Sequence, residues 1–384
     1  MNRFRKLIYT VILLISRITV IHSQTDKINL GYDISALKVY QKSNDNFILK
    51  ESEIKDYSSR LEGNLFLTGG EFGKTQFELG LRFNTSLIDS GSSKLSIRQM
   101  YIEIPITDFS FFTIGKKRKE FGASSIFSFS NRLSPVEIYI DRKERVIPEL
   151  IQYDLILSDK ISLGSIIYFN DSVDEWGKIN LCQEIDLSFD KLFIDIHFYY
   201  EKLKRMLLGW NIYYNFDEIG FFMESIIKNK NDQETLVDNT FTKKDGIQNS
   251  FAVGMNYQKD VYDFGVEYAY RSEGYRENEQ NIYFDYIKST KNVVKYNLNN
   301  FGHSYWHFSL GFSHFLDANT GIGIECTSTG DFKSQYSNLT INYLFKDAIN
   351  FAVLLRYHSG SSKSEYIIMS PYKYYLMFFV SASF

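Results

Sequence analysis

Proline is nearly absent from the 384-residue sequence, which contains only four of them. Pro105, Pro135, Pro148 and Pro371 all fall at the ends of expected strands or in loops. A sheet tolerates a residue without an N–H donor at such positions. The scarcity and placement of proline are therefore compatible with a chain built from many strands.

Cysteine and long apolar segments are also scarce. The two cysteines, Cys182 and Cys326, lie far apart in separate expected strands, whereas small disulfide-stapled domains use many more. We interpret both as incidental, and neither has the spacing of a metal ligand. The slightly polar average composition excludes multiple transmembrane helices. Transmembrane strands remain allowed, because only alternate residues of such a strand need be apolar.

The chain has no basic excess, since its formal net charge is −3. Residues 1–23 carry Arg3, Arg5, Lys6 and Arg17, a short apolar run and a small residue at a plausible cleavage point, which together predict a signal peptide. An uncleaved anchor is the alternative. Removing these residues, which hold four bases and no acid, takes the net charge to −7. A mildly acidic exported protein is not expected to bind nucleic acid, because phosphate contacts need a basic face.

No catalytic motif stands out, so we expect no enzyme, no cofactor and no metal. His303 and His307 are four apart but lie at a loop-to-strand boundary, so they do not share a face as a helical zinc pair would. Glu184 and Asp186 are interpreted as solvated groups, because nothing nearby completes a site. A membrane-embedded lipase or protease is a further alternative without a recognisable site.

Aromatic residues are abundant instead, with 28 Tyr and 33 Phe. Apolar and polar residues alternate along many segments of about ten residues, as a half-buried strand requires. The last eleven residues show the pattern most clearly. One face of that segment is apolar to the terminus and consists of Tyr374, Leu376, Phe378, Val380, Ala382 and Phe384. Such an apolar terminus is expected to pack against another part of the structure, because otherwise nothing compensates the conformational entropy lost when it is ordered.

Connections of two kinds follow each other in strict alternation. Tight turns containing Asp are expected at 345–347, 316–319, 259–261, 216–218, 189–191, 158–160 and 107–108. Longer connections are expected at 359–373, 330–334, 273–304, 229–247, 201–204, 171–179, 117–149 and 89–94. All long connections then lie at one end of the sheet and all tight turns at the other, which is typical of transmembrane barrels and is not required of soluble sandwiches.

The sequence thus predicts an all-β fold, a transmembrane antiparallel up-and-down β-barrel formed by residues 24–384 as a single domain. It has about eighteen strands if residues 28–40 form the first strand, and sixteen or seventeen if they are a periplasmic tail. The C-terminal strand should pair with residues 349–358 on one side and with the first strand on the other. Barrels of this size leave an aqueous lumen, and the aromatic excess then forms girdles at the two membrane interfaces.

The C-terminal strand resembles the closing strand of bacterial outer-membrane β-barrels, which commonly ends in Phe and is read by the barrel-assembly machinery. A second resemblance covers about residues 95–170. Gly115-Lys116, Phe121-Gly122, Asn131 to Pro135 and Arg145 to Pro148 resemble a loop of outer-membrane porin-like barrels, although Phe121 stands where Trp is commoner. The resemblance implies that 117–149 folds inward and narrows the pore. A solvated outer loop is the alternative, since charge runs are usually hydrated faces.

Strand parity predicts which charged side chains point into the lumen. On the strands they are Glu62, Glu78, Arg82, Asp154, Glu184, Asp186, Asp195, Glu224, Glu267, Arg271, Glu325 and Arg356. The candidate constriction residues of the long loop are Lys116, Arg118, Arg132, Arg142 and Arg145. Rings of charge set the ion preference of a pore. The acidic wall favours cations and the basic loop opposes it, so the preference stays open.

Two functions remain. The first is a porin that admits small hydrophilic solutes or ions across the bacterial outer membrane, in contact with outer-membrane lipid and lipopolysaccharide, as a monomer or a trimer. The second is a non-conducting surface protein that binds polysaccharide, host matrix or phage through its loops. The Tyr-rich connection 273–304 (Tyr275, Tyr283, Tyr286, Tyr296 and Tyr305) suits the second function.

Overall fold

The structure is a computed structural model of the whole chain. It describes residues 29–43, 57–70, 75–86, 93–119, 121–124, 126–131, 133, 136–138, 143–145, 147–169, 179–201, 205–237, 240–290, 302–345, 349–362, 364–368, 370 and 372–383. The signal peptide predicted at 1–23 and the terminal Phe384 lie outside these residues.

Eighteen strands form one antiparallel sheet. They are β1 (Asn29–Ser43), β2 (Tyr57–Gly69), β3 (Gln76–Ser86), β4 (Lys94–Thr107), β5 (Ser110–Lys116), β8 (Glu149–Ser158), β9 (Ile161–Phe169), β10 (Asn180–Phe189), β11 (Leu192–Glu201), β12 (Arg205–Phe216), β13 (Ile219–Val237), β14 (Thr240–Lys259), β15 (Tyr262–Arg271), β16 (Ser304–Phe312), β17 (Thr320–Thr329), β18 (Ser334–Phe345), β19 (Ile349–Gly360) and β20 (Tyr372–Ser383). A separate two-stranded sheet, β6 (Val136–Ile138) with β7 (Lys143–Arg145), stands apart from it.

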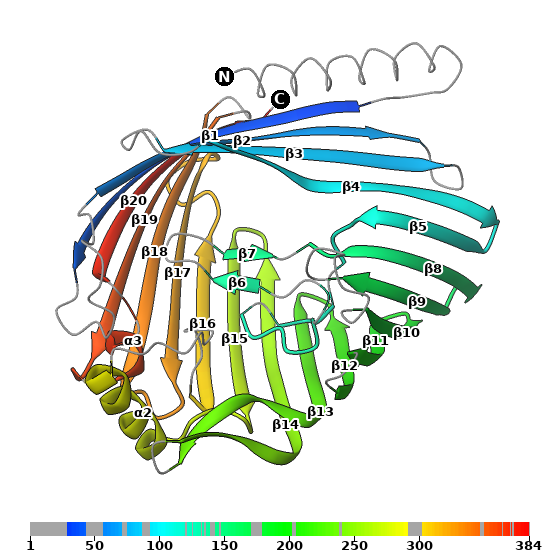
Figure 1. The fold of residues 1–384 in the computed structure, drawn as a ribbon. Coiled ribbons are helices and arrows are strands. Elements are labelled where there is room, and N and C mark those ends of the chain that lie inside the picture. Colours follow the sequence, from blue (N-terminus) through cyan, green and yellow to red (C-terminus); the bar gives the residue numbers. More distant parts are fainter. Residues whose placement is uncertain are drawn as a thin grey trace.

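The sheet closes on itself, because β1 pairs with both β2 and β20 (Figure 1). Phe378 lies opposite Val353 of β19 on one side and opposite Lys38 of β1 on the other. The first strand is therefore β1, and the expected count of eighteen is confirmed. Closure leaves no unpaired sheet edge, which a strand surrounded by lipid could not tolerate.

The closing register can be checked by crosslinking. With Cys182 and Cys326 replaced by alanine, Lys38→Cys combined with Phe378→Cys places two thiols at directly opposed positions, where Cβ atoms lie about 4.5–5.5 Å apart. We expect oxidation to join β1 and β20. The pair Lys38→Cys with Tyr374→Cys is the control, because Tyr374 lies opposite Lys42. Crosslinking of the control but not of the test pair would refute the register.

Short turns join the strands at one end of the barrel. Two-residue turns occupy 108–109, 159–160, 190–191, 217–218 and 260–261, as predicted. Asp190, Asp217 and Asp260 each adopt a positive φ there, a conformation that Asp tolerates better than most residues. The turn near 317 is longer than predicted and spans 313–319, while the turn predicted at 345–347 lies largely outside the described residues.

Two of the long connections contain regular structure that was not predicted. The stretch 229–247 is not a loop, since β13 and β14 continue to Val237 and from Thr240 as a long hairpin. The connection 273–304 contains α2 (Glu277–Thr290), and a short helix, α3 (Glu365–Ile368), precedes β20. No helix in the described part of the chain is long and apolar enough to cross a membrane.

The outer surface of the barrel is apolar. On β20 the exposed large apolar side chains are Tyr374, Phe378 and Val380, and the same alternation holds on β1, where Tyr32 and Ile34 are exposed. Large apolar side chains are exposed on strand after strand, whereas soluble monomers rarely expose a contiguous apolar patch of more than a few hundred Å². This is the lipid-facing band of a transmembrane barrel.

Candidate functional site

The segment between β5 and β8 lies within the ring of strands (Figure 1). Its described residues 117–119, 121–124, 126–131 and 133 contact side chains of β4 and of β8–β16, and we call them the inner loop. Two apolar contacts and two carboxylates that accept backbone hydrogen bonds attach the inner loop to the wall, together with several further side-chain contacts. Together these contacts fix which part of the lumen it fills.

The first apolar contact is made by Phe121 and Leu133. Both are buried against an apolar patch on the inner face of β8–β13 that includes Leu150, Tyr168 and Tyr199. The Phe121 ring also lies 4.0 Å, centroid to centroid, from the imidazole of His197 on β11. A water-filled lumen would leave this patch wet, so covering it favours the inward position of the inner loop.

The second apolar contact centres on Phe127. Its ring stacks on Tyr305 of β16 at 5.4 Å, and the ring of Tyr366 in α3 lies 6.4 Å from that of Tyr305, centroid to centroid. Ala252 and Ala269, both fully buried, provide the space for these rings on β14 and β15. Aromatic pairs of this kind contribute about 0.5–1.5 kcal/mol beyond their buried area.

Glu224 of β13 is the first carboxylate contact. Its side chain is 0% exposed and accepts hydrogen bonds from the backbone N–H groups of Ser124 (3.1 Å), Ser130 (3.4 Å) and Phe129. These donors have no strand partner, because the inner loop has no regular structure. A buried carboxylate that collects such donors satisfies them together.

Glu267 of β15 is the second carboxylate that contacts the inner loop. It accepts hydrogen bonds from the hydroxyl of Ser124 and from the backbone N–H of Phe127, the latter at 3.2 Å. The hydroxyl of Tyr199 adds a third polar contact by donating to the carbonyl oxygen of Ser130 at 2.7 Å. Sequence parity identified Glu224 and Glu267 as inward-facing but gave no reason to pair them with the inner loop.

Gly122 is required where the inner loop meets Glu224. Its φ is +101°, and a Cβ atom there would lie 2.6 Å from Glu224 Oε2. Both the conformation and the close approach exclude a larger residue. The Phe-Gly pair of the sequence motif thus joins an apolar anchor to a position that only glycine can occupy.

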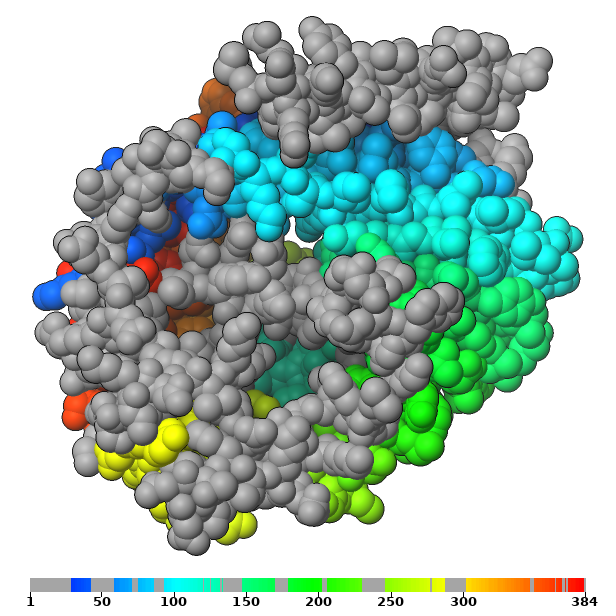
Figure 2. All heavy atoms as spheres, in the orientation of Figure 1, coloured from blue at the N-terminus to red at the C-terminus, as the bar shows by residue number. Residues whose placement is uncertain are grey.

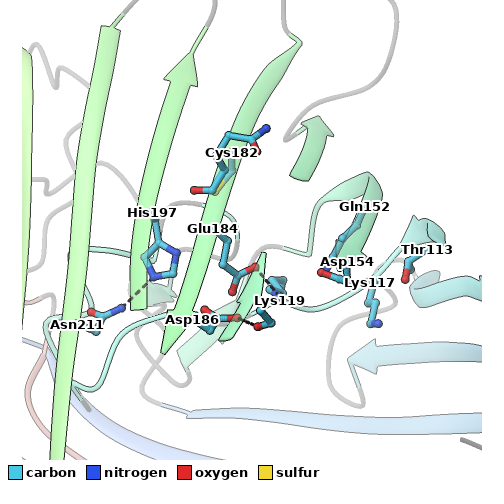
Figure 3. Close-up of polar contacts among 12 residues, drawn as sticks. Thr113, Lys117, Lys119, Gln152, Asp154, Cys182, Glu184, Asp186, His197 and Asn211 are labelled. Atoms are coloured by element: carbon cyan, nitrogen blue, oxygen red, sulfur yellow. Dashed lines mark hydrogen bonds and ion pairs between the residues drawn. The ribbon is translucent and has the colours of Figure 1, made fainter. Parts of the chain in front are cut away.

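Acidic side chains line the wall on the β8–β11 side. Figure 3 shows Lys119 of the inner loop beside Glu184 and Asp186, with Asp154 further along the row. Lys119 Nζ lies 2.8 Å from Glu184 Oε2. Burial alone would lower the pKa of Lys119, but the Glu184 carboxylate holds it above its usual value. Glu184 is buried and ion-paired, so the expectation that it is solvated is wrong.

Basic side chains gather on the β2–β4 side. Arg82 Nη2 lies 2.7 Å from Glu62 Oε2, and Arg60 Nη1 lies 3.4 Å from the other oxygen of the same carboxylate. Arg98 is close to Arg82 and to Arg118 of the inner loop. Arg98 lies where the register between β3 and β4 shifts. The bulge changes the direction of its side chain, so strand parity could not identify it as inward-facing.

The remaining predicted residues are distributed around the wall. Gln99 donates to Glu78, Ser162 donates to Asp186, Gln152 donates to Asp154, and Arg356 donates to Asn338. Lys116, expected to line the pore, lies opposite Met100 and Glu149, which are both exposed, so it is on the outer side of β5, where it donates to the carbonyl oxygen of Ile97. Asp195 lies near Asp186 and Lys119. Arg132 and Arg142 lie outside the described residues, and Arg145 is placed in β7 by its backbone alone.

Sequence reasoning missed several inward groups. Lys117 pairs with Glu103 of β4 at 2.6 Å, and Asp33 of β1 accepts a hydrogen bond from Asn64 at 2.7 Å. Parity would have located Glu103 and Asp33 once the strand boundaries were known. Among the described residues no group of His, Cys, Asp or Glu can hold a metal ion, and both cysteines are free thiols.

The fold is a closed, 18-stranded antiparallel barrel, and solved structures share it. OccK8 (OprE) from Pseudomonas aeruginosa is similar at 9% identity and a TM-score of 0.61, over 93% of this chain and 98% of that one. OccAB4 from Acinetobacter baumannii is similar at 9% identity and a TM-score of 0.61, over 94% and 99%. The outer membrane protein OprD from P. aeruginosa is similar at 9% identity and a TM-score of 0.57, over 94% and 95%.

At such identities the likeness concerns the fold alone. No family model and no curated protein matches the chain.

Proposed function

We propose that the protein is a porin of the bacterial outer membrane, a water-filled channel for passive diffusion of small hydrophilic solutes or ions. The observation that supports this most is an opening in the barrel beside the inner loop. In Figure 2 it lies between the atoms of β3–β4 and those of β5 and β8. The likeness to OprD, whose name includes the outer membrane, supports the location.

The inner loop is proposed to act as the constriction. It covers the lumenal face of β8–β16, contacts β4 through Lys117 and Arg118, and leaves the rest of the β1–β5 side to the solute. A passing solute would then meet the arginines of β2–β4 and Arg118 on one side and the acids of β8–β11 on the other. Selectivity would come from width and from these opposed charges.

The same proposal accounts for the ends of the chain and the outer surface. An N-terminal signal peptide would direct export, and the C-terminal strand would be the segment read by the barrel-assembly machinery. The apolar outer face would contact lipid and lipopolysaccharide. Tyr275, Tyr283 and Tyr305 are buried, so they do not form the partner-binding surface considered for 273–304.

A liposome-swelling assay tests the proposal. Purified, folded protein reconstituted into liposomes should allow small sugars and amino acids to enter, with rates that fall steeply as solute size rises. Liposomes that stay impermeable to every small solute would contradict a porin.

Arg118→Glu should shift the ion preference of the channel towards cations, because it reverses one charge of the basic cluster in the lumen. The reversal potential under a KCl gradient measures the shift. Lys160→Glu makes the same charge change in an exposed turn at the end of the barrel and should leave the potential unchanged. Equal potentials for the two variants would show that Arg118 does not line the pathway.

A further inference from the structure

A polar cavity of about 380 Å³ lies at the end of the barrel that carries the long connections. Four stretches enclose it: the start of α2 with Tyr275, the residues 302–304, the turn 329–334 and the residues 361–365 next to α3. Its size falls in the range of small-molecule sites, roughly 300–1,000 Å³. Such sites are mostly apolar, whereas the lining here is mostly polar.

The walls of this cavity are held by two carboxylates. Glu365 accepts hydrogen bonds from the backbone N–H of Gly302 (3.1 Å) and from the hydroxyl of Tyr305 (2.7 Å). Asp331 accepts from the hydroxyl of Thr329 (2.6 Å) and from the backbone N–H of Lys333 (3.2 Å). The Glu365 contacts join segments distant in sequence and the Asp331 contacts fix the conformation of the turn 329–334, so the cavity is shaped before a ligand arrives.

The polar groups left for a ligand are uncharged. Within the described part of the chain, the side chains of Asn281, Ser304 and Ser361 make no hydrogen bond, and all three line the cavity. The charged side chains Lys333, Asp331 and Glu365 already have partners. Lys333 Nζ lies 3.5 Å from Asp331 Oδ2, and Glu365 accepts hydrogen bonds from Gly302 and Tyr305. Amide and hydroxyl groups offer donors and acceptors together without selecting a charge.

We propose that this cavity binds a neutral, hydroxyl-rich saccharide unit at the outer mouth of the barrel. Each sugar hydroxyl both donates and accepts, which matches the amide and the hydroxyls of the lining. The cavity has room for a unit of one or two sugar rings. This binding site goes beyond conduction and does not depend on it.

The saccharide can be a free disaccharide approaching the channel or the end of a surface glycan. Two probes distinguish these sources: maltose, and the delipidated polysaccharide of lipopolysaccharide. Binding is measured by calorimetry and saturation-transfer NMR on full-length folded protein in a detergent without a sugar headgroup. Binding of maltose assigns the site to free sugar, and binding of the polysaccharide alone assigns it to a glycan chain.

Two matched pairs of variants locate the site. Asn281→Ala should weaken binding about fivefold, the loss expected for one net hydrogen bond, while Asn278→Ala on the exposed face of the same helix should not. Ser361→Trp should abolish binding by filling the cavity, and Ser362→Trp, which lies outside it, should not.

The proposal is overturned if neither probe binds, or if binding occurs but each matched pair behaves alike. It is also overturned if putrescine, a diamine probe, binds in place of both sugars, since the cavity would then recognise cations. Conductance of the same protein is measured in parallel, so failure of this site is distinguishable from failure of the proposed channel.

Discussion

Replacing Glu224 and Glu267 together with alanine should widen the channel and raise its single-channel conductance several-fold. The two carboxylates accept hydrogen bonds from four backbone N–H groups of the inner loop. Each buried N–H left without a partner costs about 1–3 kcal/mol. Loss of both acceptors therefore favours movement of the inner loop away from the wall, where its apolar contacts and the Lys119–Glu184 ion pair remain.

Glu218→Ala is the matched control, because it removes an exposed carboxylate of the turn before β13 without touching the inner loop. Conductance in planar bilayers and heat-modifiable mobility on gels report channel width and folding separately. A double variant that is folded but has unchanged conductance would show that the inner loop does not set the width of the channel. The conservative Glu224→Gln keeps one acceptor oxygen and should lie between the wild type and the alanine variant.

The second large effect is expected at Glu273, just after β15. Its carboxylate lies 2.8 Å from Lys228 Nζ of β13 and 3.3 Å from Arg271 Nη2, and the Lys228 and Glu273 side chains are almost fully buried. Glu273→Ala leaves Lys228 buried without this partner, which costs about 3–5 kcal/mol. The variant should unfold at lower urea concentration than the wild type, and limited proteolysis should cut the 272–303 connection faster.

The same pair predicts a pH dependence. Burial would raise the pKa of Glu273, but Lys228 and Arg271 lower it from 4.5 to about 2. The folded-state pKa is depressed, so the stabilisation is complete above about pH 4.5 and is lost as pH falls towards 2. The stability difference between wild type and Glu273→Gln should therefore shrink across that window. A difference that stays constant down to pH 2 would contradict the assignment.

Much of the fold could be predicted because a transmembrane barrel obeys a strict period. The alternation of the last strand predicted which residues face outward, and the Asp-containing turns predicted the end of the barrel at which short connections lie. Asp190, Asp217 and Asp260 do occupy left-handed turn positions. The closing partner of β20 was left open by the sequence, since both β1 and β2 have suitable patterns.

What could not be predicted depends on tertiary contacts. The hairpin of β13 and β14 beyond the barrel is polar and has no alternation that distinguishes it from a loop. Strand parity did not identify Arg98 as inward-facing, because a bulge shifts the register at its position. The pairing of Glu224 with Ser124 joins residues a hundred positions apart, and no local pattern contains it.

The Phe121-Gly122 motif was visible in the sequence, but the sequence did not explain why these two residues are needed. The motif singled out the segment after β5 as a distinctive loop, and the resemblance to porin-like barrels implied that this loop folds into the pore. Only the contacts explain the motif, since Phe121 fills an apolar patch and a Cβ at position 122 would meet Glu224 Oε2.

The central claim is that the barrel conducts, and single-channel recording in a planar lipid bilayer tests it most directly. Purified full-length protein, shown to be folded by its heat-modifiable mobility, is added at low concentration in KCl. Discrete, reproducible conductance steps are predicted, with larger steps for the Glu224→Ala, Glu267→Ala double variant. Inserted, folded protein that gives no steps in either form would contradict the claim.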